Sequence, residues 1–405
     1  MGGMARGRRV AGAGGGVVGT LLCAGMLVGL TTATGASAAT SAWSAHGSAE
    51  QVYVLALPAG AQVELLDANG RVVPSQNPDG QTVASQRADS LGGLLFRQVP
   101  PGTGYRVLDM ASGQESGPVT VHSDQAAPWD PRIYDQTIKD RGYQYLTTRD
   151  GTKLAIYVHP PTSPAGVTEG LPTGQSLQVG LPNGTYVPPG PDYAPPYPTL
   201  IEYSGYGYAD PAGPENGIAA LANLMGFAVV DVNMRGTGCS GGAFNFFEPL
   251  QSLDGYDVIE AIAHQPWVLG HKVGMLGISY GAISQLFVAS TDPPALAAIA
   301  PLSTIDTTAT TLYPGGILNT GFAVAWAEQR QSDAEPAGPN SGQPWAYQQI
   351  EDGDTTCQAN QALHGDAADL MGEIGTNNYY NPSFADPLDP ITFVDKIDVP
   401  VFMAC

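Results

Sequence analysis

A Gly-x-Ser-x-Gly pentapeptide at residues 277–281 is the stretch of this chain best placed to do chemistry. A short apolar run at 272–278 leads into it, and an apolar run with helical spacing follows at 282–289. Strand, tight turn and helix in this order are typical of a nucleophile elbow, which exposes the serine hydroxyl at the turn. The sequence therefore predicts that Ser279 is a catalytic nucleophile, with the N-terminus of the next helix beside the developing oxyanion.

A second match to the same pattern, at residues 238–242, contains Ser240. The apolar run before it ends at Val232, five residues intervene, and Pro249 follows without a helix cap. A serine in such a loop is not held for attack, so we interpret Ser240 as a loop residue. An ordinary Gly-Ser turn between strand and helix is the alternative interpretation of Ser279 itself.

The composition limits the class of protein. The chain has 405 residues, of which 43% are hydrophobic and 13% charged, so it is long enough for two globular domains. Lys and Arg total 16 against 37 Asp and Glu, which gives a formal charge of −21. This charge argues against nucleic acid or an anionic membrane as a partner.

The first 38 residues have the pattern of a secretory signal peptide. Three arginines at positions 6, 8 and 9 precede a Gly/Ala-rich apolar run at 10–30, and Ala-Ser-Ala follows at 36–38. This arrangement predicts cleavage after Ala38 and a secreted, extracellular protein that has no membrane segment after cleavage. A retained membrane anchor is the alternative.

The cysteines give few constraints. An oxidising compartment permits a disulfide between Cys239 and Cys357, but their spacing does not require one. Cys23 leaves with the signal peptide, and Cys405 is the last residue. No Cys-x-x-Cys or His-Glu-x-x-His pattern occurs, so we expect no zinc site and no cofactor.

Residues 39–125 are predicted to form a small accessory β-sandwich. Short β-type runs alternate with turn sequences there, and the strands are expected at 52–55, 62–66, 94–96 and 105–108. The region contains no convergent group of acid, base and nucleophile. A binding or spacer role is therefore expected.

Residues 126–405 are predicted to form an α/β domain. After a hairpin that turns at Asp150-Gly151, strands are expected at 199–203, 227–232, 272–278 and 296–301, with helices at 217–224, 254–263 and 282–289. This alternation predicts a doubly wound, mostly parallel sheet covered by helices on both faces. Asp254 and Asp257 are expected near the N-terminal end of their helix. Residues 302–390 read as a cap insertion that shapes the substrate pocket, and a last strand is expected at 399–405.

Four motifs in one order resemble a known family. They are Leu-Ile-Glu-Tyr-Ser-Gly-Tyr at 200–206, Asp-Val-Asn-Met-Arg-Gly-Thr-Gly-Cys-Ser-Gly-Gly at 231–242, Asp-Gly-Tyr-Asp at 254–257, and Gly-Ile-Ser-Tyr-Gly at 277–281. Together they resemble the X-Pro dipeptidyl-peptidase family of serine hydrolases, which also contains cocaine esterase and the α-amino-acid ester hydrolases. The likeness covers residues 142–301 well and the cap loosely. It implies an α/β-hydrolase fold and acyl transfer through a serine acyl-enzyme.

The resemblance also assigns roles at the site. It makes Ser279 the nucleophile and the backbone N–H of Tyr280 one oxyanion donor. The second donor is a tyrosine hydroxyl after the strand at 199–203, and Tyr206 occupies that position. A plain turn tyrosine is the alternative for Tyr206, and Tyr203 and Tyr208 are its nearest competitors.

The acid and the base of a triad are expected elsewhere. In this fold the order is Ser, then Asp or Glu, then His, so both partners and a C-terminal β-domain are expected after Cys405. His264 and His271 precede Ser279, and His364 lies in the cap, so all three are poor candidates for the base. The chain would then be a piece truncated before its Asp and His, and inactive alone.

The substrate class stays open between two kinds of acyl bond. The family resemblance implies cleavage of X-Pro dipeptidyl bonds in a short peptide, and hydrolysis of a carboxylic or amino-acid ester is the alternative. Asp306 is the nearest carboxylate to residues 313–316, where amino-ester hydrolases have several. A non-catalytic binding protein on a hydrolase scaffold is the third possibility. The partner is a small molecule or short peptide, and nothing in the sequence indicates an oligomeric state.

Overall fold

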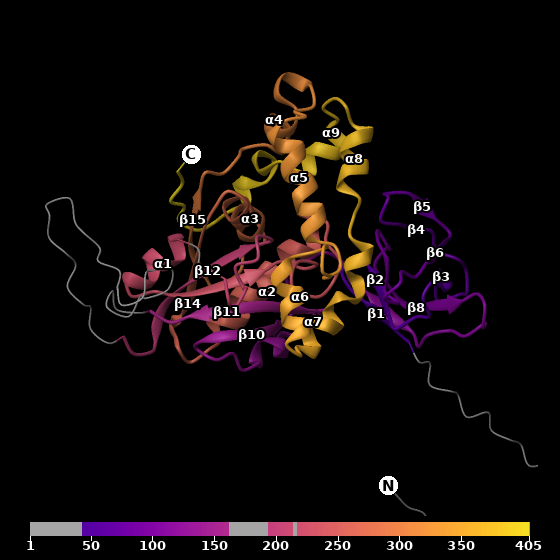
Figure 1. Cartoon of the computed structure of the whole chain (residues 1–405), viewed down its shortest axis with the longest axis horizontal. Helices are drawn as coiled ribbons and strands as arrows, with labels where there is room; N and C mark the ends of the chain where they lie inside the picture. The colour runs from indigo at the N-terminus through magenta and orange to yellow at the C-terminus, as the bar shows by residue number, and fades with distance from the viewer. Residues whose placement is uncertain (1–42, 162–192, 214–216, 405) are drawn as a thin grey trace, which may run out of the picture. The chain divides into compact units, whose positions relative to one another are not determined.

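The computed structural model describes residues 43–161, 193–213 and 217–404 (Figure 1). The predicted signal peptide lies outside the described residues, as does most of the segment at 160–198. Among the described residues, none of the helices combines the length and the apolar character needed to cross a bilayer.

Two small antiparallel sheets enclose the core of the N-terminal β-domain. One sheet has the order β1 (Ser44–Gly47), β2 (Val52–Leu55), β7 (Leu94–Phe96), and the other has the order β6 (Ser85–Arg87), β3 (Gln62–Leu66), β8 (Gly102–Asp109), β9 (Val119–Val121). A two-stranded ribbon, β4 (Ser75–Gln76) and β5 (Thr82–Val83), completes it. Val52 and Val54 of β2 meet Val63 and Leu65 of β3 in one core, because alternate side chains point to one face. The predicted small β-domain before the α/β core is confirmed.

A six-stranded mixed sheet forms the centre of the second part of the chain. Its order is β10 (Gly142–Thr147), β11 (Lys153–His159), β13 (Ala228–Asn233), β12 (Tyr197–Ser204), β14 (Val268–Ile278), β15 (Leu296–Leu302). The last four strands in this order are parallel, while the β10–β11 hairpin joins them antiparallel. All residues of β13 are buried, as expected for a parallel strand covered on both faces. The predicted α/β-hydrolase fold with a mostly parallel sheet is confirmed.

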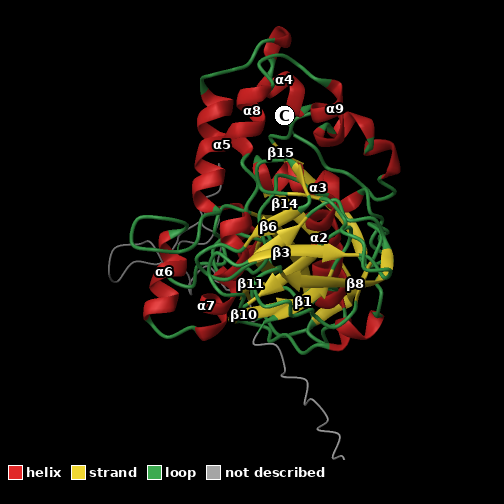
Figure 2. Ribbon diagram, turned by 90° about the vertical axis from the view of Figure 1, so that its right-hand side faces the viewer, coloured by secondary structure: helices red, strands yellow, loops and turns green. Residues whose placement is uncertain are grey.

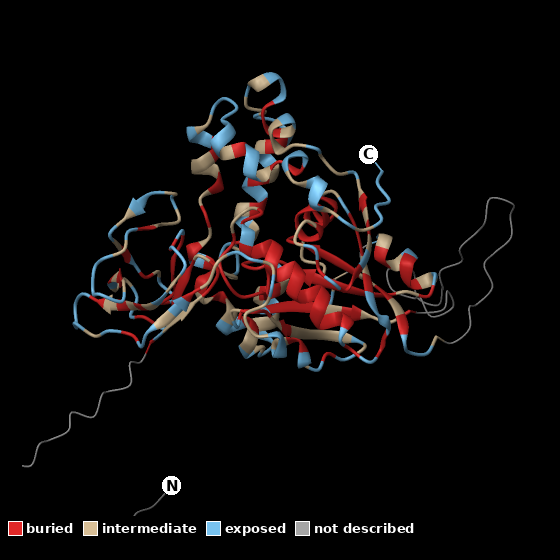
Figure 3. Ribbon diagram, turned by 180° about the vertical axis from the view of Figure 1, so that it is seen from behind, coloured by how far each residue is buried: buried red, intermediate tan, exposed pale blue. Residues whose placement is uncertain are grey.

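Helices cover both faces of this sheet. On one face, Ala219 and Ala222 of α1 (Gly217–Leu224) pack on Val229 and Leu276. On the other face lie α2 (Pro249–Ala263) and α3 (Tyr280–Ala289), whose apolar side chains share the main core with β12, β13 and β14. The short helix η1 (Pro131–Asp135) packs beside α2. Figure 3 shows the sheet and the helices against it coloured largely as buried.

Helix α2 begins earlier than the sequence predicted. Pro249 occupies its first position, where a proline loses no hydrogen bond and has the φ angle that a helix needs. The prediction that Asp254 and Asp257 lie near the helix N-terminus is therefore wrong. Both carboxylates are buried within the helix and form ion pairs, Asp254 with Arg235 and Asp257 with Arg149.

A run of short helices separates β15 from the last described residues. They are α4 (Thr308–Leu312), η3 (Pro314–Gly316), α5 (Phe322–Asp333), α6 (Pro344–Glu351), α7 (Thr355–Asn360), η4 (Gln361–Asp366), α8 (Leu370–Thr376), α9 (Pro382–Ala385), η5 (Asp386–Leu388), η6 (Pro390–Thr392) and η7 (Val394–Lys396). Figures 1 and 2 show α4, α5, α8 and α9 grouped together, with α6 and α7 beside β10 and β11. In place of the predicted strand at 399–405, Val401 and Ala404 form isolated parallel bridges to β15.

A disulfide joins Cys239, in the loop after β13, to Cys357 of α7. The two cysteines are 118 residues apart, so the bond restricts the unfolded chain strongly.

We expect the double exchange Cys239→Ala/Cys357→Ala to lower the free energy of unfolding by about 2–4 kcal/mol, measured by denaturant titration. A reducing agent should destabilise the natural protein and leave the variant unchanged. Equal midpoints for the two proteins would contradict this expectation.

The β-domain and the α/β-domain are joined by buried polar contacts. Nη2 of Arg97 donates to the backbone oxygen of Asp366 at 2.7 Å, and Nε2 of Gln51 donates to Oε2 of Glu248 at 2.9 Å. Ser48 donates its hydroxyl to Asp150 at 2.7 Å. Because a buried polar group without a hydrogen-bond partner is costly, these contacts favour the observed packing of the two domains.

Asp366 should make the stability depend on pH. Burial raises its pKa to about 7, although the Arg97 guanidinium opposes this. Because the pKa is raised in the folded state, folding favours the protonated carboxyl of Asp366. Its contribution to the free energy of unfolding is fully present below about pH 4 and is lost as the pH rises towards 7. We expect Asp366→Asn to gain stability relative to the natural protein across that interval, by a few kcal/mol in urea titrations. The exposed Asp79→Asn is the control, and parallel curves for Asp366→Asn and the natural protein would refute the effect.

Candidate active site

Ser279 lies in a strained turn between β14 and α3. Its φ is 57° and its ψ is −116°, which is a costly conformation for a residue with a side chain. Its backbone N–H donates to the oxygen of Leu302 at 3.0 Å, which fixes the turn against β15. The half-buried serine therefore stands at the carboxyl edge of the parallel strands, as the elbow pattern predicted.

Two glycines make this turn possible. A Cβ atom on Gly277 would lie 2.7 Å from the backbone oxygen of Gly281, and one on Gly281 would overlap Oε1 of Glu202. A side chain at position 277 would push β14 and α3 apart, and one at position 281 would displace the buried carboxylate of Glu202 in β12. The Gly-x-Ser-x-Gly spacing thus reflects the close approach of three elements.

The hydroxyl of Tyr206 lies 3.3 Å from Oγ of Ser279. Nε1 of Trp326, in α5, donates to the same tyrosine oxygen at 3.3 Å. The Arg330 guanidinium lies 4.9 Å from the centre of the Tyr206 ring. The structure thus brings together the two side chains named from the sequence, and adds Trp326 and Arg330, which no local pattern could have placed there.

Tyr203 and Tyr208, the alternatives to Tyr206 as the second oxyanion donor, make other contacts. Tyr203 is buried and donates its hydroxyl to the backbone oxygen of Gln251 at 2.8 Å. Tyr208 contacts the Tyr206 ring edge-on at 5.9 Å, and burial raises its pKa to about 12. Among these tyrosines, Tyr206 is the one hydrogen-bonded to Ser279.

Tyr280 is the first residue of α3. The first N–H groups of a helix have no acceptor within the helix, so this N–H is available at the turn. Its side chain is fully buried, and burial raises the pKa of its hydroxyl. The ring packs edge-on against Tyr206 at 5.5 Å and Trp326 at 5.2 Å, which holds both in place.

The three histidines weighed as bases have other partners. His264 directly follows α2 and lies 2.8 Å from the backbone oxygen of Glu260, while His271 lies in β14, 2.8 Å from the backbone oxygen of Ala263. His364 is buried with Nε2 2.8 Å from the oxygen of Ser240, and burial lowers its pKa. None of the three serves Ser279. A base and an acid beyond Cys405 stay a prediction.

Ser240 has a structural role. Its hydroxyl donates to the backbone oxygen of Asn233 at 2.7 Å and accepts from the N–H of Ala155 at 2.8 Å. It is fully buried. Ser240 is a loop residue, as predicted, but the loop is tightly packed.

Two buried carboxylates lie below the nucleophile turn. Glu202 of β12 and Asp231 of β13 are register partners on adjacent parallel strands. Burial, then the neighbouring Asp231 charge, raises the pKa of Glu202, and burial also raises the pKa of Asp231, against the effect of His159. The sequence placed Glu202 in a strand, but only the fold brings it beneath Gly281.

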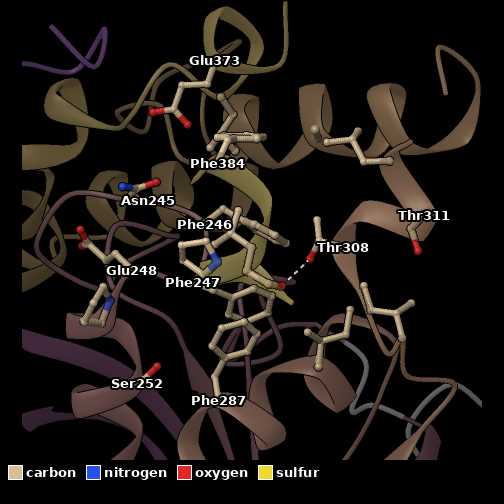
Figure 4. A pocket seen from close by; sticks show the side chains of 18 of the residues that line it. Asn245, Phe246, Phe247, Glu248, Ser252, Phe287, Thr308, Thr311, Glu373 and Phe384 are labelled. Carbon is tan, nitrogen blue, oxygen red and sulfur yellow. Dashed lines mark hydrogen bonds between the residues drawn. The ribbon is translucent and has the colours of Figure 1, made fainter. Parts of the chain in front are cut away.

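Ser279 opens into a cavity of about 920 Å³. Several aromatic rings line its walls and come from separate elements: Phe246 and Phe247 from the loop before α2, Phe287 from α3, Trp326 from α5 and Phe384 from α9. Figure 4 shows three of these phenylalanines converging, with Glu248 and Asn245 on one side and Thr308 on the other. Residues of the 302–390 segment line much of the cavity, which therefore suits a substrate with an apolar part. Among the described residues, no cluster of His, Cys, Asp or Glu is arranged to hold a metal ion.

Comparisons with known proteins give similarities over parts of this chain. A Mycobacterium bovis protein named as a serine esterase is 34% identical over 109 residues, which span 26% of this chain and 17% of that protein. A CocE/NonD family hydrolase from Staphylococcus aureus is 18% identical with a TM-score of 0.40, over 66% of this chain and 44% of that one. An aminopeptidase from a Thaumarchaeota archaeon is 16% identical with a TM-score of 0.42, over 69% and 45%. The chain thus spans less than half the length of these proteins.

The sequence model of one family covers more than half of the chain. It is that of the X-Pro dipeptidyl-peptidase (S15 family), and it matches residues 180–405. The match includes β12, β13, the turn at Ser279 and the segment at 302–390. The chain belongs to the X-Pro dipeptidyl-peptidase (S15) family.

Proposed function

We propose that this protein is a serine hydrolase in which Ser279 attacks a peptide or ester carbonyl and forms an acyl-enzyme. The observation that carries the proposal is the strained Ser279 turn, with the Tyr206 hydroxyl 3.3 Å away, open to a large apolar cavity. In this reaction the serine oxygen bonds to the carbonyl carbon, the leaving group departs with a proton, and water then releases the acyl group. The proposal assigns the nucleophile and the oxyanion donors, and names no general base among the described residues.

The oxyanion would be stabilised by two donors, the Tyr206 hydroxyl and the Tyr280 N–H. An indole N–H can only donate, so the Tyr206 oxygen is the acceptor towards Trp326. The Tyr206 hydroxyl proton is then free to point towards Ser279 and an oxyanion beside it. The Arg330 guanidinium, 4.9 Å from the centre of the Tyr206 ring, is itself paired with Asp333 at 2.8 Å.

For the substrate, we propose an X-Pro dipeptidyl bond in a short peptide. Family membership supports this, and so does Glu373, a cavity carboxylate that could pair with a free substrate ammonium. Hydrolysis of an aryl or amino-acid ester is the second candidate, favoured by the aromatic walls of the cavity. Turnover of Gly-Pro-anilide but not of its N-acetyl analogue would support the first, and equal turnover of both would reject it.

A fluorophosphonate probe tests the proposed chemistry directly. We expect the full-length protein to be labelled at Ser279, as mapped by mass spectrometry of the digested adduct, and Ser279→Ala to lose the label. Ser240 is the matched serine within the same sequence pattern and should stay unlabelled. An adduct on another serine, or no adduct on the folded protein, would reject the proposal in favour of a non-catalytic binding protein.

We also propose that the protein acts outside the cell. The charged and apolar pattern of residues 1–38 and the Cys239–Cys357 disulfide both support export, since such bonds persist in oxidising compartments. Fusing residues 1–38 to a reporter should send the reporter into the medium. Retention of the reporter in the cell would argue against export.

A further inference from the structure

The turn that carries Tyr206 has little rigidity of its own. It follows the end of β12 at Ser204 and is outside any helix or strand. A glycine stands on each side of the tyrosine, and Gly207 has a φ of 93°. Glycine leaves the backbone the greatest conformational freedom. The place of the Tyr206 hydroxyl beside Ser279 therefore depends on contacts from outside the turn.

Gln343 supplies such a contact from the segment between α5 and α6. Its Nε2 donates to the backbone oxygen of Gly205 at 2.7 Å. This oxygen and the N–H of Tyr206 belong to one planar peptide unit, and that N–H donates to Oγ of Ser204 at 3.4 Å. The peptide plane directly before Tyr206 is thus held at both edges. Gln343 is only 4% exposed, so little water competes for its hydrogen bond.

The orientation of the Gln343 carboxamide is fixed by two donors on its other side. Oε1 accepts from Nε1 of Trp345 at 2.7 Å and from Nδ2 of Asn233 at 3.0 Å. An indole N–H can only donate and a backbone oxygen can only accept, so Oε1 faces Trp345 and Nε2 faces Gly205. Oδ1 of the buried Asn233 accepts from the N–H of Ala209 at 3.2 Å, at the far end of the turn. One buried network therefore holds the turn at both ends.

The segment that carries Gln343 is itself firmly attached. Gln343 directly precedes α6, which packs against α7 (Figure 1). Ala346 of α6 shares a small buried core with Ala209, Cys239 and Cys357. Because Cys239 follows β13 and Cys357 lies in α7, the disulfide ties this segment to the central sheet.

We infer that Gln343 is a positioning residue for the proposed reaction, which fixes the peptide plane before Tyr206 and so holds the Tyr206 hydroxyl beside Ser279. The inference rests on the proposed function, because it concerns the same oxyanion site. Gln343 is not among the described residues that line the cavity, so it acts on the reaction through Tyr206. A displacement of about 1 Å at a reacting centre can cost about a hundredfold in rate.

Gln343→Met keeps a side chain of similar length and removes both the donor and the acceptor. We expect kcat of the full-length protein to fall by about 10- to 100-fold and KM to stay within about threefold, because an oxyanion donor acts on the transition state. The rate of fluorophosphonate labelling at Ser279 should fall with kcat. Steady-state kinetics with an anilide and an ester measure the effect. A raised KM with an unchanged kcat would overturn the inference.

A double-mutant cycle with Tyr206→Phe separates positioning from a general structural role. Once the hydroxyl is absent, Gln343 has no oxyanion donor to position. Adding Gln343→Met to Tyr206→Phe should therefore lower kcat and the labelling rate by no more than about threefold. The same large loss in both backgrounds would overturn the inference.

Gln361→Met is the matched control. Gln361 is also a buried carboxamide, 5% exposed, and its Nε2 donates to the backbone oxygen of Gly238 at 3.0 Å. We expect its kcat to stay within about threefold of the natural protein, and a loss as large as that of Gln343→Met would overturn the inference. If Gln343→Met does not fold by circular dichroism, Trp345→Phe takes its place, because it removes one donor to Oε1 and keeps an aromatic ring. It should lower kcat at least about fivefold, and an unchanged kcat would overturn the inference.

The labelling experiment also distinguishes this inference from the proposed function. A Ser279 adduct that forms equally fast in the natural protein and in Gln343→Met would overturn the positioning role and keep the hydrolase. No adduct on the folded natural protein would overturn both.

Discussion

Replacing Tyr206 by phenylalanine is expected to lower kcat/KM of the full-length protein by about 10²- to 10³-fold, with the loss in kcat. The hydroxyl lies 3.3 Å from Ser279 Oγ and accepts from Trp326, so its own proton is directed to the place where the oxyanion forms. A donor aimed at charge that develops only in the transition state affects kcat more than substrate binding. The measurement is steady-state kinetics with an anilide and an ester, together with the rate of fluorophosphonate labelling.

Tyr208→Phe is the matched control for this prediction. Its ring contacts that of Tyr206 edge-on, and no hydrogen bond joins its hydroxyl to Ser279 among the described contacts. We expect its kcat/KM to stay within about threefold of the natural protein. If Tyr206→Phe also stayed within that range, the assignment of Tyr206 as an oxyanion donor would be wrong.

Arg235→Met should lower the free energy of unfolding by about 3–5 kcal/mol. Arg235 is 3% exposed and makes two hydrogen bonds of 2.8 Å to Asp254 of α2. Its Nη1 also lies 3.0 Å from Asp150, in the turn of the β10–β11 hairpin. The methionine would leave two buried carboxylates without their cation, which costs more than the pair itself contributes. Denaturant titration at neutral pH measures the change.

An exposed pair provides the comparison for Arg235. Arg132 lies 2.6 Å from Asp130, but its side chain is 83% exposed. Arg132→Met should therefore change the stability by less than about 1 kcal/mol. Similar losses of stability in Arg235→Met and Arg132→Met would show that burial of Arg235 with its two carboxylates does not increase the cost of removing the charge.

The features that could be predicted from the sequence are those that depend on a few neighbouring residues. The elbow at 277–281, the hairpin turn at Asp150-Gly151 and the alternation of strands with helices were predictable, because turn chemistry and apolar periodicity act over a few residues. The start of α2 was missed, because Asp254 looked like a residue at a helix N-terminus. Its actual partner, Arg235, comes from the preceding strand-end loop, and that pairing cannot be read from helical spacing.

The sequence alone determined the family, the class of fold and the serine in the turn, since these depend on short motifs and local backbone preferences. Only the tertiary structure decided what surrounds that serine. Trp326 reaches Tyr206 across 120 residues of chain, and Gln343 reaches Gly205 across 138 residues. Contacts between residues so distant in the sequence depend on how whole helices and strands pack. They leave no periodic signal in the sequence.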